Sequence, residues 1–283
     1  MSTIAVIGAG VMGADVTLNL AAFGHSVILK DIDKGVLQAF KDSIPRQLRG
    51  YRMLGWIPEH GSAAEVGAHI HLTDGYDGIA DADWVVENVT EDWDTKKSVY
   101  QDLGRICKPE VYFAVNTSCI PITKIAALMP CPDHVVGAHF MNPVPLMKIV
   151  EVVRGYHTSD ETLDQMKRLL SSIGKTGIVV KDSAGFVSNR LSHLFMNEAA
   201  FLVQDGIAKP VEIDAIFKQG YGHKMGPLET ADLIGLDTVV KSLDVLYQYY
   251  QDTKFRCCPL LRQMVDAGDI GKKSGRGFYE YRA

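Results

Sequence analysis

Short, nearly continuous apolar runs mark the first two thirds of the chain. They occupy residues 3–7, 26–30, 84–88, 111–115, 134–139 and 148–153. Strands of a parallel sheet are buried on both faces, so uninterrupted apolar runs are typical of them. Residues 11–23, between the first two runs, have the apolar spacing of a helix. The pattern therefore predicts an α/β domain built on a parallel sheet.

The pattern changes at Ser183. Strand signals fade there, and apolar residues recur three or four positions apart over residues 187–203, 210–218 and 236–250. This spacing predicts helices. We expect a sheet domain over residues 1–182 and an all-α domain over residues 183–283, joined near residues 182–185.

A glycine-rich turn follows the first apolar run. Gly8, Gly10 and Gly13 form the pattern G-x-G-x-x-G directly before the first helical segment. Gly8 allows a tight turn, Gly10 lets the backbone approach a pyrophosphate, and Gly13 lets the helix pack closely on the strand. With Val11 and Met12 between them, these residues predict a dinucleotide site in a Rossmann-type doubly wound sheet.

The second apolar run ends at Asp31. Its distance from the glycine turn is close to the spacing of about twenty residues at which a carboxylate accepts the ribose hydroxyls. A negative charge there repels a 2′-phosphate and favours NAD over NADP, although the neighbouring Lys30 and Lys34 favour the opposite choice. The alternative for Asp31 is a turn residue.

The run at 134–139 ends at His139, and Glu151 lies in the next run. A histidine with a pKa near neutrality can take a hydroxyl proton, while a carboxylate on its other ring nitrogen fixes the tautomer and stabilises the imidazolium. In open α/β sheets, such groups gather at strand ends. The pair predicts oxidation of an alcohol, or the reverse reaction, and the alternative is an ordinary hydrogen-bonded histidine.

Polar residues also follow the runs at 84–88 and 111–115, where a nicotinamide and its ribose would lie. They are Glu91, Lys96, Asn116, Thr117 and Ser118. For Glu91 and Lys96 the alternative is a solvated helix start.

Composition narrows the range of partners. A hydrophobic content of 47% and a net charge of -5 describe an ordinary globular protein and argue against nucleic acid. The five cysteines contain no C-x-x-C pair and indicate a reducing compartment, and His69 and His71 lack the further ligands of a metal site. No apolar run is long enough to cross a membrane. We expect a cytoplasmic protein without a metal.

Taken together, the motifs resemble the short-chain L-3-hydroxyacyl-CoA dehydrogenase family, which includes bacterial 3-hydroxybutyryl-CoA dehydrogenases. The resemblance runs nearly from end to end. It is carried by GAGVMG (8–13), VVENVTED (85–92), NTSCIPIT (116–123), GAHFMNPVPLMKIVEVV (137–153), KDSAGFVSNR (181–190), MGPLETADLIGLD (225–237) and GKKSGRGFYEY (271–281).

The resemblance implies roles for individual residues. His139 would be the base, Glu151 its orienting carboxylate, and Ser118 and Asn189 the groups that hold the reacting oxygen. It further implies a dimer formed through the helical domain and an L-3-hydroxyacyl-CoA substrate. Besides the glycine turn and Asp31, the implied NAD contacts are Glu91, Lys96, Asn116, Ser118, Asn142 and Lys273.

One region departs from the family pattern. Pro45 is expected to interrupt the helix over residues 40–54 and to leave a short, broken arm after it, and Arg46, Arg49 and Arg52 recur every three residues. The lining of the acyl pocket differs too, at Val115, Cys119 and Met141.

These departures leave the carrier of the substrate open. The same chemistry would serve an acyl group on an acyl carrier protein, in fatty acid metabolism or polyketide biosynthesis, or a free hydroxy acid. A structural or sensor protein that binds NAD(H) without turnover is the non-enzymatic alternative. Lys175 resembles the catalytic lysine of other β-hydroxyacid dehydrogenases but lacks their lysine-to-asparagine helical pattern, so no role is expected for it.

Overall fold

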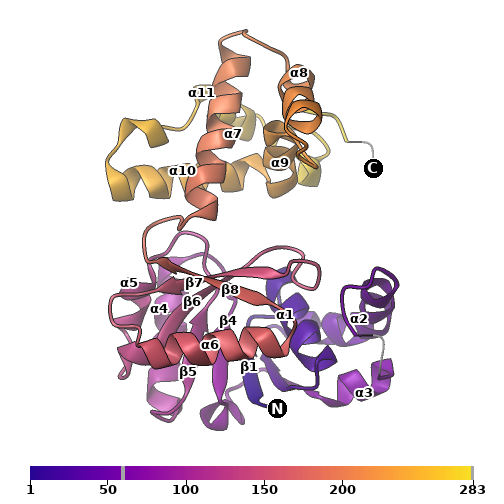
Figure 1. Ribbon diagram of the computed structural model, residues 1–283, viewed down its shortest axis with the longest axis vertical. Helices are drawn as coiled ribbons and strands as arrows, with labels where there is room; N and C mark the ends of the chain where they lie inside the picture. Colours follow the sequence, from indigo (N-terminus) through magenta and orange to yellow (C-terminus); the bar gives the residue numbers. More distant parts are fainter. Residues whose placement is uncertain (59–60, 282–283) are drawn as a thin grey trace. The chain divides into compact units, whose positions relative to one another are not determined.

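The computed structural model describes residues 1–58 and 61–281. The chain divides into two compact units, Met1–Ser183 and Ala184–Ala283. Unit 1 runs from indigo through magenta in Figure 1, and unit 2 runs from orange to yellow. Unit 1 is an α/β domain and unit 2 is helical, so the predicted fold class is confirmed.

Unit 1 is built on an eight-stranded sheet with the order β3-β2-β1-β4-β5-β6-β7-β8. Neighbouring strands are parallel except at β6 and β7, which pair antiparallel. The chain winds outward from β1 on one side and from β4 on the other, so the strand order reverses between them, where doubly wound sheets bind ligands. The strands are β1 (Thr3–Ile7), β2 (Ser26–Lys30), β3 (Ile70–Thr73), β4 (Trp84–Glu87), β5 (Tyr112–Val115), β6 (Val135–Phe140), β7 (Ile149–Arg154) and β8 (Thr176–Lys181).

The six apolar runs all form strands, and each predicted boundary lies within one residue of the observed one. The two strands that no apolar run marks, β3 and β8, form the two edges of the sheet. Edge strands are partly solvated and therefore carry polar residues, which weakens the apolar signal. His71 lies on β3, whereas His69 is the C-cap of the short helix before it.

Helices cover both faces of the sheet. On one face, alternate strand residues such as Val6, Leu29 and Val86 share a core with Leu18 and Leu170. Figure 1 shows α6 crossing this near face. On the other face, β6 meets α5 so closely that a Cβ on Gly137 would lie 2.8 Å from Ile122. The helices are α1 (Val11–Ala22), α2 (Lys34–Met53), α3 (Ala63–Ala68), α4 (Trp93–Ile106), α5 (Ile122–Ala126) and α6 (Asp160–Ser172), with 3-10 turns at Ile79–Asp81 and Pro132–His134.

The expected interruption at Pro45 is wrong, because α2 continues through this residue. A proline inside a helix costs about 3 kcal/mol. Burial of a large apolar side chain contributes roughly 1.5–3 kcal/mol, so the buried face of α2 offsets that cost. The buried residues of α2 are Leu37, Phe40, Ile44 and Leu48, while Pro45 is exposed. The segment that follows is short, as expected, and leads to the six-residue α3.

Unit 2 packs its helices around Met196, Leu236, Leu243 and Leu261. The helices predicted at 187–203 and 236–250 are confirmed, whereas the segment 210–218 forms α8 followed by a π-helical turn. No helix in the described residues is both long and apolar enough to cross a membrane. The elements of unit 2 are α7 (Ser188–Gln204), α8 (Pro210–Ala215), the π-turn Ile216–Gly220, α9 (Pro227–Ile234), α10 (Leu236–Tyr250), α11 (Pro259–Asp266) and the 3-10 turns Thr253–Phe255 and Lys272–Ser274.

Candidate active site

The glycine turn between β1 and α1 has the geometry of a phosphate site. A Cβ on Gly13 would lie 1.8 Å from the carbonyl oxygen of Gly8, so this position admits no side chain. A Cβ on Gly10, by contrast, would meet nothing within 4 Å. No side chain caps the N-terminus of α1, where Val11 is exposed and Met12 is partly buried. An open turn at an uncapped helix N-terminus fits the pyrophosphate of a dinucleotide.

Asp31, at the end of β2, holds this turn in place. Its Oδ2 accepts a hydrogen bond from the backbone N–H of Ala9 at 2.7 Å, which brings the carboxylate beside the glycines. Of the lysines that favoured NADP, Lys30 is buried with its Nζ 4.9 Å from the ring centre of Tyr76. Lys34 is ion-paired with Asp74 at 2.9 Å. The charges around Asp31 therefore favour NAD.

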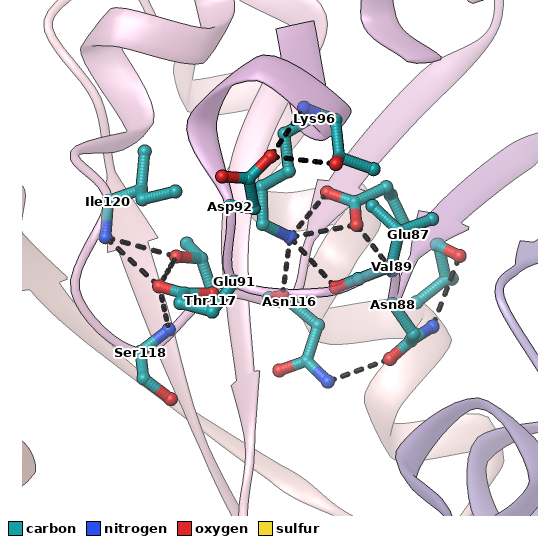
Figure 2. Close-up of polar contacts among 12 residues, drawn as sticks. Glu87, Asn88, Val89, Glu91, Asp92, Lys96, Asn116, Thr117, Ser118 and Ile120 are labelled. Carbon is teal, nitrogen blue, oxygen red and sulfur yellow. Dashed lines mark hydrogen bonds and ion pairs between the residues drawn. The ribbon is translucent and has the colours of Figure 1, made fainter. Parts of the chain in front are cut away.

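Lys96 links the ends of β4 and β5, as Figure 2 shows. Its ammonium lies 2.8 and 2.9 Å from the two carboxylate oxygens of Glu87, and both side chains are fully buried. Nζ also donates to the carbonyl oxygens of Val89 and Asn116, at 3.4 and 3.3 Å. Lys96 is therefore not a solvated residue at a helix start. In this structure it ties two loops together instead of exposing its charge to a cofactor.

Glu91 organises the loop after β5 (Figure 2). Its Oε1 accepts hydrogen bonds from the Thr117 hydroxyl at 2.6 Å and from the N–H groups of Ser118, Cys119 and Ile120 at 3.1, 2.9 and 3.3 Å. Hydrogen bonds to a carboxylate are stronger than neutral ones. Glu91 thus fixes the backbone that presents Ser118. This role differs from the alternative of a solvated residue at a helix start.

Asn116 connects three neighbouring strand ends. Its amide nitrogen donates to the side-chain oxygen of Asn88 at 2.7 Å, and its amide oxygen accepts from the N–H of Phe140 at 3.3 Å. The ends of β4, β5 and β6 are therefore joined directly before the position where a nicotinamide ribose would lie.

His139 and Glu151 face each other across the antiparallel pair β6–β7. His139 Nδ1 lies 2.9 Å from Glu151 Oε2, and both side chains are buried. A carboxylate only accepts hydrogen bonds, so Nδ1 carries the proton and Nε2 presents its lone pair. Ser118 Oγ lies 3.4 Å from Nε2. Serine, imidazole and carboxylate therefore form one row at the edge of the sheet.

Three further expected site residues are Asn142, Asn189 and Lys273. Asn142 is exposed on the loop between β6 and β7. Asn189 and Lys273 belong to unit 2. The backbone oxygen of Asn189 is 2.8 Å from His193 Nδ1, and Lys273 Nζ is 2.5 Å from Asp237 Oδ1. The roles of these three residues in a site with His139 stay predictions.

Two residues that also shape the site were not predicted from the sequence, Glu87 and Asn88. A carboxylate that ends an otherwise apolar strand was the available signal for Glu87, since a buried charge requires a partner. Asn88 carried no such signal. Among residues 1–58 and 61–281, no cluster of three or more His, Cys, Asp or Glu side chains is arranged to hold a metal ion.

Comparison with known families decides the assignment. The model of the 3-hydroxyacyl-CoA dehydrogenase NAD-binding domain matches residues 3–183, and that of the C-terminal domain of the same family matches residues 185–281. The chain belongs to the 3-hydroxyacyl-CoA dehydrogenase family. It is thus an oxidoreductase that uses NAD, and the resemblance drawn from its motifs is confirmed.

Similar proteins cover nearly the whole chain. A probable 3-hydroxybutyryl-CoA dehydrogenase from Deinococcus radiodurans is 44% identical over 98% of this chain and 99% of its own length. The 3-hydroxybutyryl-CoA dehydrogenase of Clostridioides difficile is 40% identical over 98% of this chain and 99% of its own. The crystal structure of (S)-3-hydroxybutyryl-CoA dehydrogenase from Ralstonia eutropha superposes with a TM-score of 0.94 at 38% identity, covering 100% of both chains.

Proposed function

We propose that the protein interconverts an L-3-hydroxyacyl-CoA and the 3-oxoacyl-CoA with NAD, and that its substrate is a short acyl chain such as 3-hydroxybutyryl-CoA. The observation that carries this proposal is the row Ser118, His139, Glu151 at the sheet edge that also bears the glycine turn. The substrate names of the similar proteins support the acyl length, and the (S) designation of the Ralstonia eutropha enzyme supports the L configuration.

The glycine turn, Asp31, Asn116 and Asn142 would hold NAD, which when bound exchanges a hydride with the carbon that bears the hydroxyl. His139 Nε2 takes the hydroxyl proton in oxidation and returns it in reduction. Glu151 keeps the proton on Nδ1 and stabilises the imidazolium by its charge at 2.9 Å. A positioned acid–base group of this kind contributes roughly 10²–10⁴-fold to the rate.

Negative charge develops on the substrate oxygen as its proton leaves. Ser118 Oγ lies beside His139 Nε2, so its hydroxyl can donate to that oxygen, and Asn189 is proposed as the second donor. One well-placed donor is worth about 3 kcal/mol of barrier. Glu91 contributes indirectly by fixing the Ser118 backbone.

The decisive experiment compares three acetoacetyl substrates, with coenzyme A, an acyl carrier protein or a free acid, while NADH absorbance is followed. We expect rapid oxidation of NADH with acetoacetyl-CoA. A faster reaction on the carrier protein would favour the biosynthetic alternative, and one on the free acid would favour a hydroxy-acid dehydrogenase. NADH binding without turnover of any of the three would indicate a structural or sensor protein.

The proposal includes a homodimer formed through unit 2. Large apolar side chains lie exposed on this unit, which is typical of an interaction surface. Light scattering after gel filtration should give twice the chain mass of 31.1 kDa, and a monomeric mass would contradict the dimer. The exposed residues include Leu191, Ile207, Val211, Ile216 and Tyr221.

A further inference from the structure

A second group of ionisable side chains, two of them buried, lies in unit 1, apart from the row at His139. Asp15 comes from α1, Tyr51 from α2 and Lys175 from the turn before β8. Asp15 and Lys175 are only 6% and 5% exposed. The Tyr51 hydroxyl donates to Asp15 Oδ1 at 2.6 Å. Buried charges are costly, so the contacts that these groups make indicate what they do.

Both charges bind the backbone of one residue, Val144, in the loop between β6 and β7, residues 141–148. The N–H of Val144 donates to Asp15 Oδ2 at 3.3 Å, and the carbonyl oxygen of Val144 accepts from Lys175 Nζ at 2.5 Å. Lys175 Nζ also donates to the carbonyl oxygen of Met147 at 2.8 Å. The carboxylate thus binds a backbone N–H of the loop, and the ammonium binds two of its backbone carbonyl oxygens.

Packing alone does not require charges at these positions. Burial raises the pKa of Asp15 and lowers the pKa of Lys175 to about 8, because burial destabilises the charged form of each side chain. A well-packed apolar pair of similar volume is often at least as stable as a buried ion pair. An apolar pair, however, would leave the buried N–H and carbonyl of Val144 without these partners.

The loop they hold joins two residues of the proposed catalytic row. Its first residue, Met141, follows Phe140 at the end of β6, and its last, Lys148, precedes β7. His139 and Glu151 therefore lie within three residues of its two ends, and Asn142 is part of it. A shift of this loop would displace the imidazole and its carboxylate relative to each other.

We propose that Asp15 and Lys175, with Tyr51, are positioning residues that fix the 141–148 loop and thereby the geometry of His139, Glu151 and Asn142. The inference rests on the proposed function for its effect on catalysis, but not for its effect on the loop. Through Tyr51, the same cluster connects the C-terminal turn of α2 to this loop.

The test uses Lys175→Met, with Lys167→Met as the matched control. Lys167 lies on α6 with its side chain 48% exposed, so the control removes the same charge from the surface. Hydrogen exchange of the amides in 141–148 should accelerate about tenfold or more in Lys175→Met and stay unchanged in the control. The kcat on acetoacetyl-CoA should fall about tenfold or more, while KM for the thioester stays within about twofold.

Thermal unfolding is measured for each variant, and all assays are run well below its midpoint. The double variant Asp15→Leu, Lys175→Met separates packing from positioning, because it removes both charges together. Recovery of stability with kcat still low supports positioning, whereas recovery of both means that the pair is merely structural. If Lys175→Met does not fold, Asp15→Asn takes its place, with smaller changes expected in the same direction.

Two further outcomes overturn the proposal. Either exchange in 141–148 matches the unsubstituted protein in a folded variant, or exchange accelerates while kcat is unchanged. Failure of the proposed function is distinguishable from both. In that case the unsubstituted protein itself would turn over no hydroxyacyl thioester, while hydrogen exchange would still report on the loop.

Discussion

At the scale of single residues, His139 owes its proposed chemistry to its two neighbours. Glu151 at 2.9 Å from Nδ1 assigns the proton to that nitrogen, and Ser118 at 3.4 Å lies beside Nε2. The three side chains come from different parts of the sheet edge, so each can be changed without altering the dinucleotide turn.

We therefore predict that His139→Gln lowers kcat by roughly 10²–10⁴-fold, because the acid–base group is lost. Glu151→Gln should also lower kcat, since the imidazolium loses its counter-charge. NADH fluorescence titration should give affinities close to that of the unsubstituted protein in both cases. Near-normal kcat in His139→Gln would refute the assignment of the base.

The glycine turn supplies a second residue-scale prediction. Gly10→Ala adds a Cβ that meets nothing within 4 Å, at a φ of -63° that alanine adopts readily. We expect its thermal midpoint to be unchanged and its NAD affinity to fall about tenfold or more, because only the ligand would meet the new methyl group.

Gly13→Ala is the matched variant, because its Cβ would lie 1.8 Å from the Gly8 oxygen. It should lower the melting temperature even without NAD. Calorimetry with and without NAD distinguishes the two effects, and equal destabilisation of both variants would contradict this account of the turn.

At the scale of elements, the site depends on how neighbouring strand ends are joined. Glu91 gathers the loop after β5, Lys96 joins the loops after β4 and β5, and Asn116 reaches the end of β6. Each of these hydrogen bonds joins residues far apart in the sequence. The separation is 28 positions from Glu91 to Cys119, 20 from Lys96 to Asn116 and 24 from Asn116 to Phe140.

We predict that Glu91→Ala lowers kcat about tenfold or more, because the Ser118 backbone loses its anchor. Glu91→Gln keeps an accepting oxygen and should retain more activity. Asp94→Ala provides the control, since this nearby carboxylate is exposed in the first turn of α4. Equal activities in Glu91→Ala and Asp94→Ala would show that the loop does not need Glu91.

At the scale of the whole molecule, the buried lysine links stability to pH. The pKa of Lys175 falls from 10.5 to about 8 because burial disfavours its charged form. Between these values the unfolded chain holds the proton while the folded protein has released it. The unfolded state binds more protons there, so the contribution of Lys175 to stability rises with pH across this window.

The prediction is that the unsubstituted protein gains stability relative to Lys175→Met between pH 7 and pH 9.5, by on the order of 2 kcal/mol. Urea unfolding of both proteins at each pH measures the difference. A constant difference would mean that Lys175 titrates normally in the folded protein. Because the loop then loses its cation, kcat should fall over the same pH range.

Much of the fold and part of the site could be predicted from local sequence patterns. Apolar runs located six strands to within one residue, because burial on both faces leaves a sequence signal that does not depend on neighbours. The glycine turn and its carboxylate were recognisable because their spacing reflects backbone geometry. The helix break predicted at Pro45 was wrong, because burial of the apolar face of α2 offsets the free-energy cost of a proline inside a helix. That burial depends on the residues that pack against α2, which the local sequence does not specify.

The fold class, the NAD turn, the family and the pairing of His139 with Glu151 therefore follow from the amino-acid sequence. Three features become visible only in the folded protein: Lys96 is buried against Glu87, Glu91 holds the Ser118 loop, and Asp15 and Lys175 meet at Val144. The reason is physical: a charged side chain binds whichever polar groups the fold brings within hydrogen-bonding distance, and a local sequence pattern does not specify those partners.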